Sequence, residues 1–160
     1  MPDYGFRPMI PADLPMFKRW LDQPHMGGWW ADGATEARLV AEEFGQTRVD
    51  MRIVTADGIP FAFVQDYDAM AFDAPQYVDL PRGARAIDTF LGDPAYLGQG
   101  HAGAYLRQRA AALRQTAPLV AVDPSPANAR AIAAYTRAGF AFHRLTPCED
   151  GDMVHVMTYR

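Results

Sequence analysis

Residues 97–103 read Leu-Gly-Gln-Gly-His-Ala-Gly, with three glycines in seven positions. The mostly apolar residues 84–90 before this stretch predict a strand, and the Ala-, Leu- and Arg-rich residues 100–115 after it predict a long helix. The first backbone N–H groups of a helix have no partner within the helix and carry partial positive charge. They bind an anion where glycines leave room for its approach. The stretch therefore predicts a turn that holds a phosphate or diphosphate.

Two other phosphate-binding motifs fit this turn poorly. Residues 98–103 also read Gly-x-Gly-x-x-Gly, the dinucleotide-binding fingerprint. That fingerprint requires the turn near the start of a βαβ unit and an acidic residue about twenty positions later. Here the turn lies two-thirds along the chain, and the nearest acidic candidate, Asp123, belongs to a different pattern. No Gly-Lys-Ser/Thr follows, so a P-loop is excluded.

Outside the turn, the chain alternates between strand-like and helix-like segments. Asp57-Gly58 between two apolar runs predicts a hairpin, and Gly139 predicts the end of a helix. We expect Asp13 to cap the first helix. Strands are expected at residues 4–10, 52–55, 60–65, 84–90, 119–122, 140–145 and 153–159, and helices at 13–21, 34–44, 100–115 and 127–138. This order predicts a single mixed α/β (α+β) domain over residues 1–160.

Composition restricts the classes of protein. The chain has 160 residues, of which 49% are apolar and 21% charged, with a net charge of −4. These values are typical of one globular domain with a real core. A nucleic-acid partner is not expected, because phosphate binding requires an excess of Lys and Arg. The acidic balance is compatible with a small cationic substrate.

Cys148 is the only cysteine, so neither an internal disulfide nor a paired-cysteine metal site is expected. We interpret it as a bystander and not as a nucleophile. No signal-peptide pattern opens the chain, and no run of about 18 apolar residues occurs. We therefore expect a cytoplasmic protein, monomer or homodimer, that uses neither a membrane nor a metal.

The turn resembles the acetyl-CoA loop of the GNAT acetyltransferase superfamily, Gln/Arg-x-x-Gly-x-Gly/Ala, in all but the first place, where Leu97 stands. Residues 128–140 resemble the later motif Asn-x-x-Ala-x-x-x-Tyr-x-x-x-Gly-Phe. The resemblance implies a mostly antiparallel central sheet of about six to seven strands flanked by about four helices. It also implies that acetyl-CoA is bound by Leu97, Gly98, Gln99, Gly100, His101, Ala102, Gly103 and Asn128.

Two of these positions allow an alternative. The resemblance places Tyr135 near the thioester sulfur, where it would protonate the leaving CoA thiolate, but Tyr135 would also suit the core. His101 would either contact a phosphate or lie on the surface, and we favour the surface.

A closer similarity is to the aminoglycoside 6'-N-acetyltransferases. It is carried by Arg85-Ala-Ile-Asp88, by the turn, by Asp123-Pro-Ser-Pro-Ala-Asn128 and by the tryptophan pair that follows His25. It covers roughly residues 20–159 and is weak at residues 69–82, where that family places its acceptor-recognition loop. The similarity implies that the acceptor is a polycationic small-molecule amine.

An aliphatic amine is protonated at neutral pH and must lose a proton before it attacks a thioester. A carboxylate at the site holds the ammonium group and accepts that proton. Asp88 ends the strand before the turn, and by resemblance it occupies the catalytic acid/base position. Asp123 ends the next strand, where it would hold a second ammonium group or, alternatively, cap the following helix.

The remaining acceptor-binding candidates are acidic or aromatic. Asp66, Asp68, Asp73 and Asp79 would line an electronegative mouth, or would be solvated turn residues. Aromatic side chains would form flat walls against sugar rings, although buried tryptophans at a helix junction explain the pattern equally. The expected acceptor-binding set is Trp29, Trp30, Gln65, Asp66, Tyr67, Asp73, Asp79 and Asp123.

Three competing functions remain. The same superfamily acylates siderophore-type hydroxylysines, but that group generally carries a histidine ahead of the central strand, and none lies between His25 and His101. A protein N-terminus is another amine acceptor. A non-catalytic acyl-CoA sensor is the alternative from a different class, against which the presence of both Asp88 and Tyr135 argues.

Overall fold

The computed structural model describes residues 1–160 as two compact units that interleave along the chain. Unit 1 comprises Met1–Gln65 and Asp88–Gln99, and unit 2 comprises Asp66–Ile87 and Gly100–Arg160. The chain passes between them inside strand β3 (Ile59–Asp68), inside strand β4 (Arg85–Leu91), and within the glycine-rich turn.

Unit 1 contains strands in the order β1-β2-β3-β4, with β1 at Tyr4–Pro8 and β2 at Val49–Ala56. Strands β1 and β2 are antiparallel, and Phe6 lies opposite Val54. The β2–β3 hairpin turns at Asp57 (φ 49°) and Gly58 (φ 83°). Two consecutive positive φ angles are typical of the tight type I′ turn, so the predicted hairpin is confirmed.

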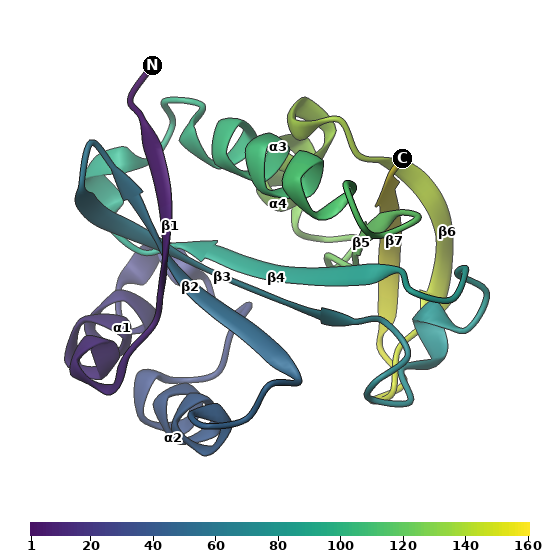
Figure 1. Ribbon diagram of the computed structural model, residues 1–160, viewed down its shortest axis with the longest axis horizontal. Coiled ribbons are helices and arrows are strands. Elements are labelled where there is room, and N and C mark those ends of the chain that lie inside the picture. Colours follow the sequence, from purple (N-terminus) through teal and green to yellow (C-terminus); the bar gives the residue numbers. More distant parts are fainter. The chain divides into compact units, whose positions relative to one another are not determined.

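Helices α1 (Leu14–Leu21) and α2 (Gly33–Glu43) pack against each other in the same unit (Figure 1). Phe17 of α1 meets Phe63 of β3 edge to face, with ring centroids 5.0 Å apart, and Phe90 of β4 completes this aromatic core. Burial of several large aromatic side chains is the main term that stabilises the unit.

Asp13 does not cap α1, contrary to expectation. A 3-10 turn at Pro11–Asp13 leads directly into the helix, so the backbone of Asp13 is already helical (φ −80°, ψ −13°) and not extended as a cap requires. Its carboxylate accepts hydrogen bonds from the Arg7 guanidinium at 2.8 and 2.9 Å and from the Ile10 N–H at 2.9 Å. The Arg7 hydrogen bond holds the pKa of Asp13 below its ordinary value.

Unit 2 contains strands in the order β4-β5-β7-β6, with β5 at Val120–Val122, β7 at Met153–Tyr159 and β6 at Ala141–Pro147. Strands β4 and β5 run parallel, whereas the other pairs in this unit are antiparallel. All three residues of β5 are buried, as a wholly apolar strand predicts. The expected mixed, mostly antiparallel sheet is confirmed, with seven strands and four α-helices.

Helices α3 (His101–Leu113) and α4 (Ala129–Ala138) lie side by side in unit 2 (Figure 1). A Cβ atom at Gly103 would lie 3.2 Å from the Cβ of Arg137, so a glycine there permits the close approach of the two helices. Gly139 ends α4 with φ 109°, which confirms the predicted helix end. None of the helices combines the length and apolar character needed to cross a bilayer.

Candidate functional site

The glycine-rich turn has the conformation of an anion cradle. Gly98 (φ 71°) and Gly100 (φ 82°) both adopt the left-handed region, and a Cβ atom at either would meet nothing within 4 Å. Glycine is therefore required there by the backbone and not by crowding. The Gln99 amide donates to the Ala95 carbonyl oxygen at 2.7 Å, which ties the turn back onto the preceding segment.

Helix α3 begins differently from its neighbours. Its N-cap, Gly100, provides no side-chain hydrogen bond, whereas Asp32 caps α2 and Asn128 caps α4 through their side chains. The first turn of α3 also carries no acidic side chain. The N-terminus of α3 thus offers its N–H groups and its dipole to an external anion.

His101 and Gly103 of the predicted acetyl-CoA loop are both buried. His101 is only 9% exposed, so the favoured surface position is wrong. Gly103 is buried against α4, where its packing role explains the glycine without a phosphate contact. The sequence pattern gives no sign of either burial, because it does not show which residues pack against the first turn of α3.

The later motif combines a helix cap with a core aromatic residue. The Asn128 side-chain oxygen accepts from the Ala131 N–H at 3.2 Å, so Asn128 precedes α4 and does not lie on its face. Tyr135 is 8% exposed, and its ring packs edge to face on Phe140 at 5.7 Å. Spacing of these residues therefore reflects the architecture of α4 as well as any contact with a cofactor.

Asp88 and Gln65 are brought together in unit 1. The Gln65 amide donates to Asp88 Oδ2 at 3.0 Å across β3 and β4. Because side chains alternate along a strand, Asp88 and Phe90 share a face of β4, and Phe63 and Gln65 share a face of β3. Asp88 is partly exposed at the edge of the aromatic core.

Of the tryptophan pair, Trp30 packs on that same face. The Trp30 ring meets Phe90 at 5.0 Å and Phe63 at 6.2 Å, both edge to face. A ring nitrogen of His25 lies 2.8 Å from the Leu91 carbonyl oxygen, which fixes the preceding segment to the end of β4. Trp30 is thus largely a core residue, whereas Trp29 is 49% exposed and open to a ligand.

Glu36 is a functional candidate that the sequence reasoning missed. It lies in the first turn of α2. Its carboxylate accepts from the N–H of Ala31, the residue directly after the tryptophan pair, at 3.2 Å. Burial raises the pKa of Glu36, and the negative charges of Asp88 and Asp32 add to this increase. A glutamate in a first helical turn is so common that the sequence offers no distinguishing signal.

Asp123 pairs with Gln76 in unit 2. The Gln76 amide donates to Asp123 Oδ2 at 3.0 Å, and Gln76 is 3% exposed. Since Asn128 caps α4, the alternative in which Asp123 caps that helix is wrong. Gln76 is a second residue that the sequence reasoning missed, because nothing along the chain links it to a position 47 residues away.

The acidic stretch, residues 66–79, does not form a row of open carboxylates. Asp66 is 2% exposed, and its two oxygens bind Arg85 at 2.6 Å and Arg109 at 2.7 Å. We expected Asp66 to contact the acceptor. It instead belongs to a structural ion cluster, because two guanidinium groups neutralise the buried carboxylate.

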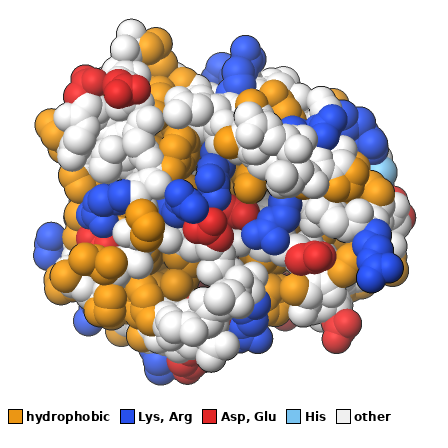
Figure 2. All heavy atoms as spheres, in the orientation of Figure 1, with side chains coloured by type: hydrophobic (Ala, Val, Ile, Leu, Met, Phe, Trp, Pro, Cys, Tyr) orange, Lys and Arg blue, Asp and Glu red, His pale blue; other side chains and the backbone are white.

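Other members of this stretch remain near the surface. Asp79 pairs with His143 at 2.7 Å, and Asp68 accepts from the Met70 N–H at 2.8 Å. Asp73 is exposed with φ 51°, and the Tyr67 ring packs on Phe72 at 5.2 Å. In Figure 2 acidic and basic side chains are interspersed over one face of the molecule. The stretch thus supplies less open negative charge than its composition predicts.

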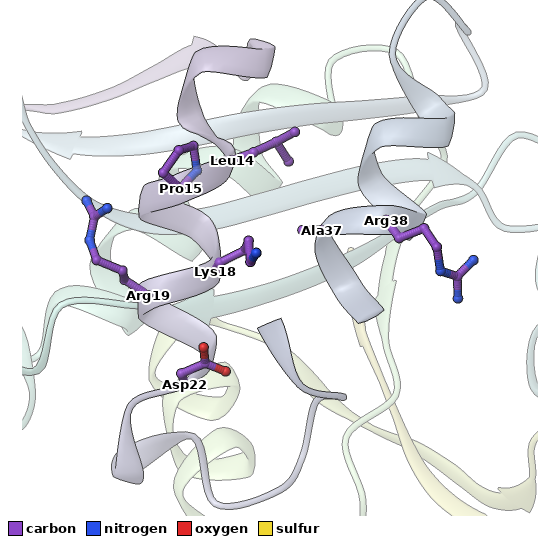
Figure 3. Close-up of a pocket in the computed structure, with 7 residues that line it drawn as sticks. All are labelled: Leu14, Pro15, Lys18, Arg19, Asp22, Ala37 and Arg38. Atoms are coloured by element: carbon purple, nitrogen blue, oxygen red, sulfur yellow. The ribbon is translucent and has the colours of Figure 1, made fainter. Parts of the chain in front are cut away.

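The residues that line the pocket between α1 and α2 include none of the predicted site (Figure 3). Its volume is about 620 Å³, and it is lined by Leu14, Pro15, Lys18, Arg19, Asp22, Ala37 and Arg38. The arrangement contains no catalytic combination of side chains. No group of three or more His, Cys, Asp or Glu side chains in the chain is placed to hold a metal ion.

Comparison with known families identifies the class of protein. Residues 9–147 match the family model described as an acetyltransferase (GNAT) domain. The chain belongs to the GNAT acetyltransferase family, and it is an N-acetyltransferase with acetyl-CoA as cosubstrate.

The chain is also similar to individual known enzymes and solved structures. The chain is 31% identical to aminoglycoside N(6')-acetyltransferase type 1 of Klebsiella pneumoniae over 96% of its own length and 82% of the relative's, with the same values for the Serratia marcescens enzyme. Among solved structures, AAC(6')-Ib in complex with paromomycin and acetyl-CoA has a TM-score of 0.86 at 28% identity, covering 98% of this chain and 93% of that one. AAC(6')-Ib with coenzyme A and kanamycin has a TM-score of 0.85 at 29% identity, covering 98% and 94%.

Proposed function

We propose that this enzyme transfers the acetyl group of acetyl-CoA to the 6'-amine of an aminoglycoside. The observation that carries the proposal is the Asp88 carboxylate, held by the Gln65 amide on the strand before the anion-binding turn. The similarity to aminoglycoside N(6')-acetyltransferases along nearly the whole chain supports the same acceptor class.

The reaction begins with a protonated amine. Asp88 holds the ammonium group and accepts its proton, a general-base contribution of about a hundredfold or more. The neutral amine then attacks the thioester carbonyl, and the carbonyl oxygen takes up negative charge that a backbone N–H of β4 stabilises. The Gln65 amide is suited to orienting Asp88, because a neutral donor does not cancel the negative charge of the carboxylate.

Collapse of the tetrahedral intermediate breaks the C–S bond and releases CoA. Tyr135 donates a proton to the CoA thiolate, and the second proton that the attacking nitrogen loses as the amide forms restores the Tyr135 hydroxyl. The diphosphate of acetyl-CoA binds at the N-terminus of α3, whose N–H groups have no side-chain cap. Arg or Lys side chains are not required for this contact, since the helix dipole and the N–H groups supply the positive potential.

The polycationic acceptor is bound by negatively charged side chains and by exposed aromatic rings. Trp29 offers an exposed ring to the sugar face. Asp123 supplies a carboxylate for a second ammonium group. Acetylation converts a cationic amine into a neutral amide and so removes one positive charge from the acceptor.

The test is CoA release from acetyl-CoA by the purified protein with kanamycin or tobramycin, followed by assignment of the acetylated nitrogen by NMR. An aminoglycoside with a hydroxyl group at the 6' position is the matched control and should give no release. Acetyl-CoA binding without CoA release for any aminoglycoside would refute the proposal and favour the non-catalytic sensor. Release with a hydroxylysine or a peptide N-terminus alone would favour those acceptors instead.

A further inference from the structure

Gln76 lies in a short 3-10 turn, Pro75–Tyr77, within the stretch 69–82 that the sequence resemblance matches only weakly. Its side chain is 3% exposed, and its amide nitrogen donates to Asp123 Oδ2 at 3.0 Å. A glutamine this buried is uncommon, because its polar atoms must all find partners away from water.

One of those atoms does not find a partner. Gln76 Oε1 is buried without a hydrogen bond, which is unfavourable for stability. Rotation of the amide by half a turn would place Oε1 against the Asp123 carboxylate and would lose the one hydrogen bond that the side chain donates there. The contact with Asp123 therefore determines how the amide is oriented, at the expense of the oxygen.

The turn that carries Gln76 is held firmly. Arg144 of β6 donates to the Pro75 carbonyl oxygen at 3.2 Å, and His143 of the same strand pairs with Asp79 at 2.7 Å. Tyr77 is fully buried in a cluster with Ala86 of β4 and Ala121 of β5. A side chain presented from such a support is preorganised for a precise contact.

We propose that Gln76 is a positioning residue that holds the Asp123 carboxylate in the orientation needed for an ammonium group of the acceptor. This inference rests on the proposed function. The arrangement repeats that of Gln65 and Asp88, where an amide nitrogen also donates to one carboxylate oxygen at 3.0 Å. In the acidic stretch, residues 66–79, the group proposed to assist acceptor binding is thus a buried amide.

The test is Gln76→Met, which keeps the length of the side chain while removing both the donor and the orphaned oxygen. The Michaelis constant for kanamycin should rise about tenfold, with kcat within about twofold, because a hydrogen bond to a charged group is lost away from the reacting atoms. The melting temperature should stay unchanged or rise. Gln115→Met, at an exposed position of the same unit, is the matched control.

A double-mutant cycle separates positioning from a structural role. Asp123→Asn should raise the same Michaelis constant, and Gln76→Met should then add little, because the two residues act as one unit. Gln76→Leu serves as the second apolar variant if the methionine variant does not fold.

A wild-type Michaelis constant in Gln76→Met, additive effects in the cycle, or a loss of stability with unchanged kinetics would overturn the Gln76 role alone. Absence of CoA release by the wild-type protein with every aminoglycoside would instead refute the proposed function, and the Gln76 role with it.

Discussion

The carboxylates of Asp66 and Asp88 have different partners, although both lie on central strands. Asp66 is neutralised by Arg85 and Arg109, whereas Asp88 accepts from the neutral amide of Gln65. A carboxylate paired with two guanidinium groups has little attraction left for an ammonium ion, and one held by an amide keeps its net charge. These contacts support a structural role for Asp66 and are compatible with the catalytic role proposed for Asp88.

Asp88→Asn should lower kcat by about a hundredfold or more, because the asparagine amide cannot accept the ammonium proton. Acetyl-CoA binding, measured by calorimetry, should change by less than about twofold. Asp150→Asn, which removes an exposed charge from a turn, serves as the control for net charge. A wild-type rate for Asp88→Asn would remove Asp88 from the mechanism.

Glu36→Gln should reveal the effect of the raised pKa of Glu36. A carboxyl group with a folded-state pKa above its unfolded value destabilises the folded protein at neutral pH, and the penalty disappears as the pH falls through the folded pKa. The glutamine keeps an acceptor for the Ala31 N–H and removes the charge. The variant should be more stable by about 0.5–1 kcal/mol at neutral pH.

Thermal unfolding over a pH series measures this difference, which should shrink toward acid pH. Glu42→Gln on the same helix is the control, because Glu42 forms only an exposed ion pair with Arg38. A less stable Glu36→Gln at neutral pH would show that the ionised form of Glu36 is needed for folding.

At the scale of elements, the starts of α3 and α4 show two uses of a helix N-terminus. Asn128 satisfies an N–H of α4 within the chain, whereas Gly100 leaves those of α3 to an external acceptor. The same backbone chemistry stabilises α4 through a side-chain cap, and in the proposed function it binds the diphosphate of acetyl-CoA at α3.

Asn128→Ala should lower the free energy of unfolding by about 1 kcal/mol through loss of the cap. Asn128→Asp should restore it, since aspartate caps a helix equally well. Chemical denaturation measures both. A wild-type stability for the alanine variant would show that the cap contributes nothing, and an altered Michaelis constant for acetyl-CoA in the aspartate variant would reveal a role for the amide nitrogen.

At the scale of the whole molecule, each unit has an interior electrostatic contact besides its apolar core. In unit 2 the Asp66 cluster joins residues from β3, β4 and α3. In unit 1 the Arg7–Asp13 pair joins β1 to the start of α1. Because side chains in the Asp66 cluster are mostly buried, removing one partner leaves uncompensated charge.

Asp66→Ala should destabilise the protein by about 3–5 kcal/mol, because Arg109 would remain 90% or more buried without its carboxylate. Asp50→Ala, which breaks a partly exposed pair with Arg52, should cost less than about 1 kcal/mol. Urea denaturation of the two variants gives the comparison. Equal effects would show that the Asp66 cluster contributes no more than a surface ion pair.

Much of the fold follows from local patterns. Asp57, Gly58, Gly98, Gly100 and Gly139 all adopt positive φ angles, which few residues other than glycine tolerate, so their positions are readable along the chain. Leu39 shows the limit of such patterns, because α2 buries Ala37 and Val40 and leaves Leu39 44% exposed.

Local sequence determined where the strands, helices and glycine-rich turn lie and which family this chain resembles, because those properties depend on neighbours a few residues apart. Tertiary structure decided the partners of the carboxylates, among them Gln65 for Asp88, Gln76 for Asp123 and Arg109 for Asp66, separated by 23, 47 and 43 residues. The charge that a side chain offers to a ligand depends on the groups packed around it. Those groups are set by the packing of strands, helices and turns in the folded chain and not by proximity along it.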